Sequence, residues 1–173
     1  MEIEDEIVNK VSSSGLITIN LEDYYSPNRR ILIDLKDNLF NGMILREKDF
    51  REFLGNHNWN SYKDANVAIT CTEEDTIIPI WAYMLVVSKL TPIVNFCMVG
   101  TLDDLETQLF QKALTNFNPS EFSAAKVVIK GCSKFPVPAY AYAEVTRLLL
   151  PFTSSIMYGE PCSTVPIYKK PKI

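Results

Sequence analysis

The strongest constraint on how this chain folds is a pattern that occurs twice along it. A short apolar run at residues 66–71, an apolar helical stretch and a second run at 93–100 return in the same order between residues 126 and 159. Such runs predict the order strand, helix, strand. When the two copies are aligned with Pro79 on Pro138, identical side chains coincide: Pro79, Ala82, Tyr83, Leu90, Pro92, Met98 and Gly100 match Pro138, Ala141, Tyr142, Leu149, Pro151, Met157 and Gly159. The pattern therefore predicts an internal duplication.

The agreement extends upstream, where the alignment shifts by one position and a helix precedes the first strand. The matched residues there are Phe50, Leu54, Asn56, Asn58, Ala65, Val67 and Ile69 with Phe110, Leu114, Asn116, Asn118, Ala125, Val127 and Ile129. Each repeat is thus helix, strand, helix, strand, and two copies are too few for a solenoid. The alternative is that any two βαβ units share such a pattern, although the pattern alone does not place Pro, Tyr and Gly.

The duplication suggests how the whole chain is organised. We expect a single α/β domain with an N-terminal extension, two internal repeats and a C-terminal tail. The domain spans residues 1–173. The extension spans 1–45, the two repeats span 46–100 and 106–159, and the tail spans 160–173. Strands that alternate with helices predict a three-layer arrangement around a mostly parallel sheet. Two alternating apolar segments near the N-terminus, with turn residues between them, predict an antiparallel edge formed by residues 16–21 and 31–35.

Composition and charge exclude several classes of function. The chain carries 17 Lys and Arg against 21 Asp and Glu, a formal net charge of −4, which provides no basic surface for nucleic acid. The acidic start MEIEDE lacks the basic and apolar regions of a secretory signal, so we expect a cytoplasmic protein. The most apolar window is interrupted by prolines and polar residues, which argues against a membrane span: Pro79, Ser88, Lys89, Pro92 and Asn95.

Three of the four cysteines follow strands at what should be one edge of the sheet. Cys71 and Cys132 come after the first strand of each repeat, at closely matching places, and Cys162 follows the last strand. Ligands collect beyond the carboxyl ends of parallel strands, and a helix start stabilises a thiolate. We therefore predict a metal site of Cys71, Cys132 and Cys162 for Zn²⁺ or an iron–sulfur cluster. Plain packing is the alternative for each thiol, because free Cys is often buried.

Two other residues that could carry chemistry favour structural roles. Cys97 matches Ile156 in mid-strand, which indicates core packing. His57, the only His, matches Phe117 at the opposite end of the strand from the thiols. We expect a partly buried, hydrogen-bonded His and no Cys–His catalytic pair. The phosphate-loop, dinucleotide-binding and nucleophile-elbow motifs GxxxxGK[ST], GxGxxG and GxSxG do not occur in the sequence.

Several segments resemble a known family. They are ITINLEDYY, LREKDFREF, IPIWAYML, VVIKGCSKFPVP and SIMYGEPCSTVPIYKKP, of which KGCS and GEPCSTVP are the most specific parts. Over nearly its full length the chain resembles a family of uncharacterised bacterial proteins, a domain of unknown function. The resemblance implies a cytoplasmic bacterial protein whose genes often neighbour iron–sulfur cluster assembly genes of the sulfur-mobilisation type. It implies no catalytic residues.

Three hypotheses about function follow. The first is an accessory protein of iron–sulfur cluster or metal homeostasis, which uses Cys71, Cys132 and Cys162 as ligands or persulfide acceptors and has iron–sulfur assembly proteins as partners. The second is a thiol-dependent transferase or hydrolase with Cys132 or Cys71 as nucleophile. The third is a homodimeric interaction module without small-molecule chemistry. Its dimer face would be formed by the aromatic helices, whose aromatic residues at helical spacing indicate core or interface positions: Trp81, Tyr83, Tyr140 and Tyr142.

Overall fold

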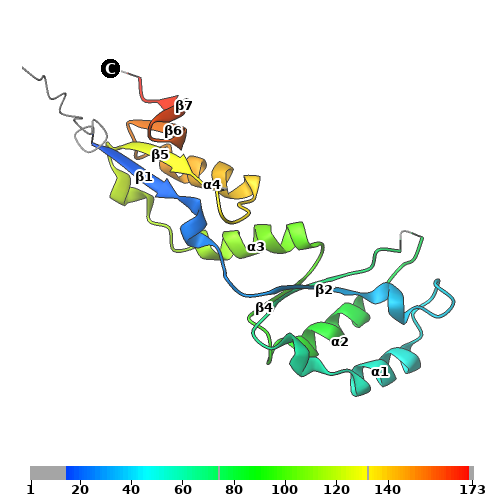
Figure 1. Ribbon diagram of the computed structural model, residues 1–173. Coiled ribbons are helices and arrows are strands. Elements are labelled where there is room, and N and C mark those ends of the chain that lie inside the picture. Colours follow the sequence, from blue (N-terminus) through cyan, green and yellow to red (C-terminus); the bar gives the residue numbers. More distant parts are fainter. Residues whose placement is uncertain (1–14, 74, 132, 172–173) are drawn as a thin grey trace, which may run out of the picture. The chain divides into compact units, whose positions relative to one another are not determined.

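The computed structural model describes residues 15–73, 75–131 and 133–171. The chain divides into two compact units: unit 1 consists of Met1–Tyr25 and Phe110–Ile173, and unit 2 consists of Ser26–Leu109. Within the described residues, four α-helices and seven strands form a mixed α/β fold with two mostly parallel sheets (Figure 1). None of the helices in this part of the chain is long and apolar enough to cross a membrane.

Unit 2 is built around a parallel three-stranded sheet in the order β2-β3-β4. Its strands are β2 (Arg30–Asp34), β3 (Asn66–Thr70) and β4 (Phe96–Val99). Its α-helices and 3-10 helices are α1 (Glu47–Asn56), α2 (Ile80–Leu90), η2 (Leu35–Asn38) and η3 (Trp59–Tyr62). The central position of β3 makes its outer neighbours, β2 and β4, the two edge strands of this sheet.

Both faces of β3 are covered, which explains its continuous apolar sequence. Ile69 belongs to the core cluster that contains Phe50 of α1 and residues of α2. On the other face, Ala68 packs with Leu105 and Leu109 of α3 (Leu102–Leu114). Helix α3 continues into unit 1.

Unit 1 holds a four-stranded sheet in the order β1-β5-β6-β7. The strands are β1 (Leu16–Asn20), β5 (Lys126–Lys130), β6 (Ser155–Glu160) and β7 (Ser163–Lys169). The first three are parallel, and β7 pairs antiparallel to β6. Helix α4 (Ala139–Leu149) and the last turns of α3 contribute to its core, and the 3-10 helices are η1 (Leu21–Tyr24) and η4 (Pro119–Phe122).

Matching residues begin the matching elements of the two units. Pro79 and Pro138 are the N-cap residues of α2 and α4, where a fixed φ and a missing N–H cost nothing. Asn20 and Asp34 end β1 and β2, and the side chain of each accepts a hydrogen bond from the backbone N–H two residues later. These caps make η1 and η2 begin directly after the strands.

The structure confirms a mixed α/β fold with mostly parallel strands, and it corrects the predicted single sheet with an N-terminal antiparallel edge. Strands β1 and β2 do not pair with each other: β1 joins β5 and β2 joins β3, both in parallel. The reason is that the chain passes from unit 1 to unit 2 at Tyr25, so each strand adds to the sheet of its own unit. The antiparallel pair is β6 with β7, joined through Pro161 and Cys162.

Three further predictions about organisation stay predictions: the single domain over residues 1–173, the repeats at 46–100 and 106–159, and the three-layer arrangement.

Candidate functional site

The predicted thiol ligands are distributed over the two units. Cys71 follows β3 in unit 2 and is half-buried against the core of that unit. Cys162 lies in the turn between β6 and β7 of unit 1 and is exposed. Cys132 lies outside the described residues. Within the described part of the chain, no group of three or more His, Cys, Asp or Glu residues is placed to hold a metal ion. The predicted Zn²⁺ or iron–sulfur site at Cys71, Cys132 and Cys162 stays a prediction.

The strand bounds change how Cys71 relates to the other repeat. Strand β3 covers Asn66–Thr70 and β5 covers Lys126–Lys130, so Thr70 and Lys130 occupy matching places at the strand ends. Gly131, and not Cys132, therefore stands directly after its strand as Cys71 does. A Cβ at Gly131 would lie 2.7 Å from the Oη atom of Tyr142. Glycine at this position thus leaves space for the tyrosine.

At the carboxyl edge of the unit 2 sheet, Asp34 holds the loop that follows β3. Its carboxylate accepts hydrogen bonds from the backbone N–H of Thr72 (3.1 Å) and from the Thr72 hydroxyl (2.6 Å), and also from the backbone N–H of Lys36 (3.1 Å). Partial burial raises the pKa of Asp34, but these hydrogen bonds outweigh it and the pKa is lowered. Burial also raises the pKa of Tyr83, with smaller contributions from Cys71 and Asp34.

At the carboxyl edge of the unit 1 sheet, a carboxylate holds the loop after β5 with more hydrogen bonds. The Glu22 carboxylate accepts hydrogen bonds from three successive backbone N–H groups of the β5–α4 loop, Ser133 (2.6 Å), Lys134 (2.6 Å) and Phe135 (3.1 Å), and from the Ser133 hydroxyl (2.9 Å). Successive N–H groups that converge in this way form an anion-binding concavity. The N–H groups of Lys134 and Phe135 are the main cause that lowers the pKa of Glu22 to about 2. A side chain of the chain itself therefore occupies this concavity.

His57 belongs to an aromatic cluster in unit 2, in agreement with its predicted structural role. Its Nε2 atom lies 2.7 Å from the Tyr62 hydroxyl. The imidazole also packs against Phe53 and Trp59, with ring centroids 4.8 and 4.7 Å apart. Cys97 packs against the core of the same unit, as expected, and burial raises the pKa of its thiol.

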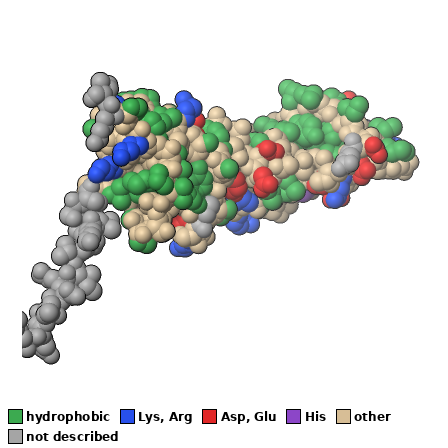
Figure 2. All heavy atoms as spheres, turned by 90° about the horizontal axis from the view of Figure 1, so that it is seen from above, with side chains coloured by type: hydrophobic (Ala, Val, Ile, Leu, Met, Phe, Trp, Pro, Cys, Tyr) green, Lys and Arg blue, Asp and Glu red, His purple; other side chains and the backbone are tan. Residues whose placement is uncertain are grey.

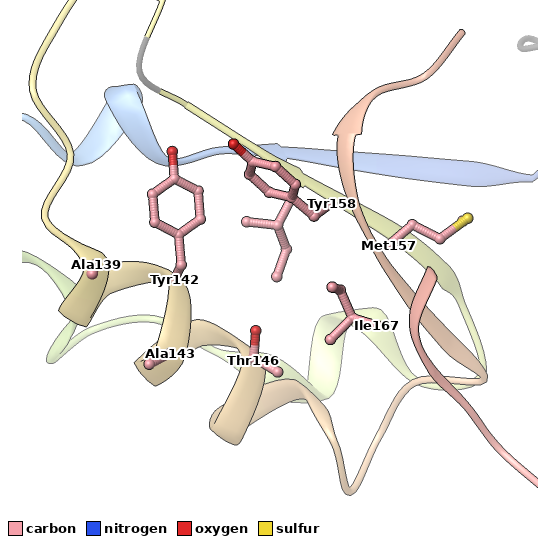
Figure 3. A pocket seen from close by; sticks show the side chains of 8 residues that line it. Ala139, Tyr142, Ala143, Thr146, Met157, Tyr158 and Ile167 are labelled. Carbon is pink, nitrogen blue, oxygen red and sulfur yellow. The ribbon is translucent and has the colours of Figure 1, made fainter. Parts of the chain in front are cut away.

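Two apolar hollows lie at matching places in the two units. In unit 2, a hollow of about 410 Å³ runs between α2 and β4. We call it the α2 groove, and it is lined by Ile80, Tyr83, Met84, Val87 and Val99. In unit 1, a hollow of about 400 Å³ lies between α4 and the strands (Figure 3). We call it the α4 pocket, and it is lined by Ile129, Ala139, Tyr142, Ala143, Thr146, Met157, Tyr158 and Ile167.

The lining residues of the two hollows are related by the alignment that places Pro79 on Pro138. The five residues of the α2 groove correspond to Ala139, Tyr142, Ala143, Thr146 and Tyr158. The sequence indicated an interface role for aromatic residues of these helices, but it did not reveal the hollows. The missed signal is the apolar pair Ile80 and Met84, which lie one helical turn apart on one side of α2 and are exposed.

A family model described as a protein of unknown function (DUF2480) matches residues 5–170. The chain belongs to this family. No curated protein and no solved structure matches it. Family membership confirms the resemblance to a family of unknown function. The bacterial origin, the cytoplasmic location and the neighbourhood of iron–sulfur assembly genes stay predictions.

Proposed function

We propose that this protein is an interaction module that forms a homodimer through the α2 groove and the outer edge of β4. One observation carries the proposal: strand β6 in unit 1 has β7 along its outer edge, whereas β4, the strand at the matching place in unit 2, is an edge strand among the described residues. The occupant that we assign to the β4 edge is β4 of a second copy of the chain.

The side chains beside this edge are unusually apolar for a surface. Ile80, Met84 and Val99 are 73%, 66% and 48% exposed, and Ile77, just before α2, is 92% exposed. Figure 2 shows hydrophobic side chains on the surface of unit 2, at the right-hand end of the view. Clustered exposed apolar side chains mark interaction surfaces, whereas scattered ones need no explanation. Burial of these side chains by a second copy would contribute favourably to association.

The hydrogen-bonding groups of β4 also favour strand addition. The backbone N–H groups of Phe96 and Gly100 donate to the carbonyl oxygens of Ala65 (3.5 Å) and Ile69 (2.9 Å). Because alternate residues of a strand face alternate neighbours, the N–H groups of Cys97 and Val99 point to the outer edge. An edge that the described part of the chain leaves without a neighbouring strand is a template for pairing with another chain.

We infer from the same correspondence that the two units arose by internal duplication. Supporting features are the shared element order, the matching caps at Asn20 and Asp34, and the matching prolines at Pro79 and Pro138. On this view, β7 in unit 1 serves as an internal example of how a strand covers the edge. A twofold pairing of β4 strands would be isologous and closed, so it would stop at a dimer.

Sedimentation equilibrium of the full chain tests the proposal. A dimer of the 19.7 kDa chain is expected. A monomer at every concentration would overturn the proposal, and so would a dimer that persists when the β4 edge is altered.

The iron–sulfur or metal role at Cys71, Cys132 and Cys162 is a separate proposal, supported by the sequence positions of the thiols and the family resemblance. Metal and sulfide analysis of protein purified without air, repeated on Cys132→Ser, tests it. Bound metal or persulfide that the substitution removes would support it, and absence of both in the unaltered protein would refute it. The thiol-dependent enzyme with Cys132 or Cys71 as nucleophile is tested separately by iodoacetamide kinetics across pH. It predicts one thiol that reacts well below pH ~8.5.

A further inference from the structure

We propose that the α4 pocket of unit 1 binds a small uncharged molecule, a ring compound that carries one hydroxyl group. Its volume of about 400 Å³ lies within the range of roughly 300–1,000 Å³ that ligand pockets occupy. The site is independent of the proposed dimer, which uses unit 2.

The α4 pocket is lined by more elements than its counterpart in unit 2. It is lined by four elements, because β5, α4, β6 and β7 all contribute residues. Ile129 of β5, only 3% exposed, forms part of its wall, so the pocket reaches the core. Within the described residues, the α2 groove is lined by residues of α2 and β4 alone, and Ile69, which matches Ile129, is not among them.

Small side chains on α4 leave Ile129 of β5 within the lining. Ala139 and Ala143 stand where unit 2 has Ile80 and Met84, so the helix leaves room above β5. Strand β7 then closes the other side with Ile167, the residue at the bulge between its pairs with β6. Figure 3 shows the side chains of α4 and Ile167 on opposite sides of this space.

The chemistry of the lining determines the class of ligand. All eight lining residues are uncharged, and three of them carry hydroxyls, Tyr142, Tyr158 and Thr146. The rings of the two tyrosines meet edge to face, with centroids 5.7 Å apart and planes at 78°. Aromatic rings prefer such offset contacts, so a further ring can be accommodated beside them. A charged ligand would lose its hydration without gaining a partner of opposite charge among the lining residues, which favours a neutral one.

Thr146 supplies a polar group that orients the ligand. In Figure 3, the Thr146 side chain rises from α4 toward the space between Tyr142 and Ile167. At the matching position unit 2 has Val87, which has nearly the same shape but no hydroxyl. The ligand's own hydroxyl is therefore expected to bond with Thr146.

The test uses 4-ethylphenol as the probe and the methyl NMR signals of the full chain as the readout. Saturable shifts are expected at Ile129, Met157 and Ile167, and the anionic 4-ethylbenzoate is expected to bind more weakly by a factor of about ten or more, on the order of the cost of an unpaired charge. Shifts that do not saturate, or that spread over both units, would overturn the proposal.

Substitutions that copy the side chains of unit 2 provide matched controls. Ala143→Met and, separately, Ala139→Ile give unit 1 the larger side chains of unit 2 and should weaken binding by at least about tenfold, because they crowd the space beside β5 that the two alanines leave. Met84→Ala, the reverse change in unit 2, should leave binding unchanged. Thr146→Val should weaken the binding of 4-ethylphenol severalfold and leave the binding of ethylbenzene, which has no hydroxyl, unchanged. The proposed binding site would be contradicted if Ala143→Met and Ala139→Ile both bind 4-ethylphenol as tightly as the unaltered protein. It would also be contradicted if Met84→Ala weakens binding more than these two substitutions do.

Discussion

Replacing Met84 by Glu should dissociate the proposed dimer. The Met84 side chain is 66% exposed in unit 2, and complete burial of such a side chain contributes about 1.5–3 kcal/mol. Covering the exposed two thirds in both copies therefore contributes roughly 2–4 kcal/mol to dimerisation. Losing this contribution raises the dissociation constant by roughly 30- to 700-fold, and the cost of taking a carboxylate out of water increases the effect further.

The matched control is Ala143→Glu, which places the same charge at the equivalent position of unit 1, where Ala143 is exposed and lines the α4 pocket, outside the proposed dimer interface. Sedimentation equilibrium over a wide range of protein concentrations gives the dissociation constant of each variant. Circular dichroism confirms that both variants are folded. We expect a large increase in the dissociation constant for Met84→Glu and almost no increase for Ala143→Glu. Equal dissociation constants for Met84→Glu and the unaltered protein would show that the α2 groove lies outside the dimer interface.

Three further outcomes follow from the carboxyl edges and the thiols. Because the pKa of Glu22 is lowered, its carboxylate stabilises the fold fully above pH 4.5, and this stabilisation is lost as the pH falls toward about 2. The difference in urea unfolding free energy between the unaltered protein and Glu22→Gln should therefore shrink over that pH interval. A difference that stays constant would show that the Glu22 hydrogen bonds do not stabilise the fold. Gly131→Ala, whose Cβ would lie 2.7 Å from Tyr142 Oη, should lower the unfolding free energy by about 1–3 kcal/mol. Adding Tyr142→Phe to Gly131→Ala should restore part of the lost unfolding free energy. If the double variant is no more stable than Gly131→Ala, the clash does not involve the Tyr142 hydroxyl. Exposed Cys162 should react with iodoacetamide faster than Cys97, whose pKa burial raises, and peptide mapping that finds equal rates would contradict this placement.

Local patterns in the sequence predicted several of the elements, but not β7, which lies in the stretch expected to be a C-terminal tail. The matching prolines at Pro79 and Pro138 stand at helix starts because a proline needs no N–H there. The short apolar run at residues 66–71 indicated a strand, and the structure places β3 there with helices packed on both of its faces. These signals depend only on neighbouring residues, so one sequence suffices to find them.

Pairing between distant segments could not be predicted in the same way. The strands β1 and β2 carry the same alternation whether they pair with each other or with β5 and β3, and only the division at Tyr25 decides the outcome. Likewise, no local signal links Glu22 to Ser133, which lies far along the chain.

The candidate sites were harder to predict than the fold. Sequence order related Cys71 to Cys132, but the strand bounds relate Cys71 to Gly131, because the alignment of the two copies shifts by one position between the strands and the following helices. The linings of the two hollows differ in side-chain size at two matching helix positions, where Ala139 and Ala143 stand against Ile80 and Met84, and this difference acquires meaning only when the strands beside the helices are known.

Amide hydrogen exchange at the outer edge of β4 reveals whether the β4 strands of two copies pair with each other. If β4 strands pair across the dimer, the N–H groups of Cys97 and Val99 become hydrogen-bonded, and their protection should rise with protein concentration. Tyr158 of β6, which is paired with Val165 of β7, provides a reference that is protected at every concentration. Exchange of Cys97 and Val99 that stays fast and independent of concentration, while Tyr158 is protected, would contradict pairing through the β4 edge.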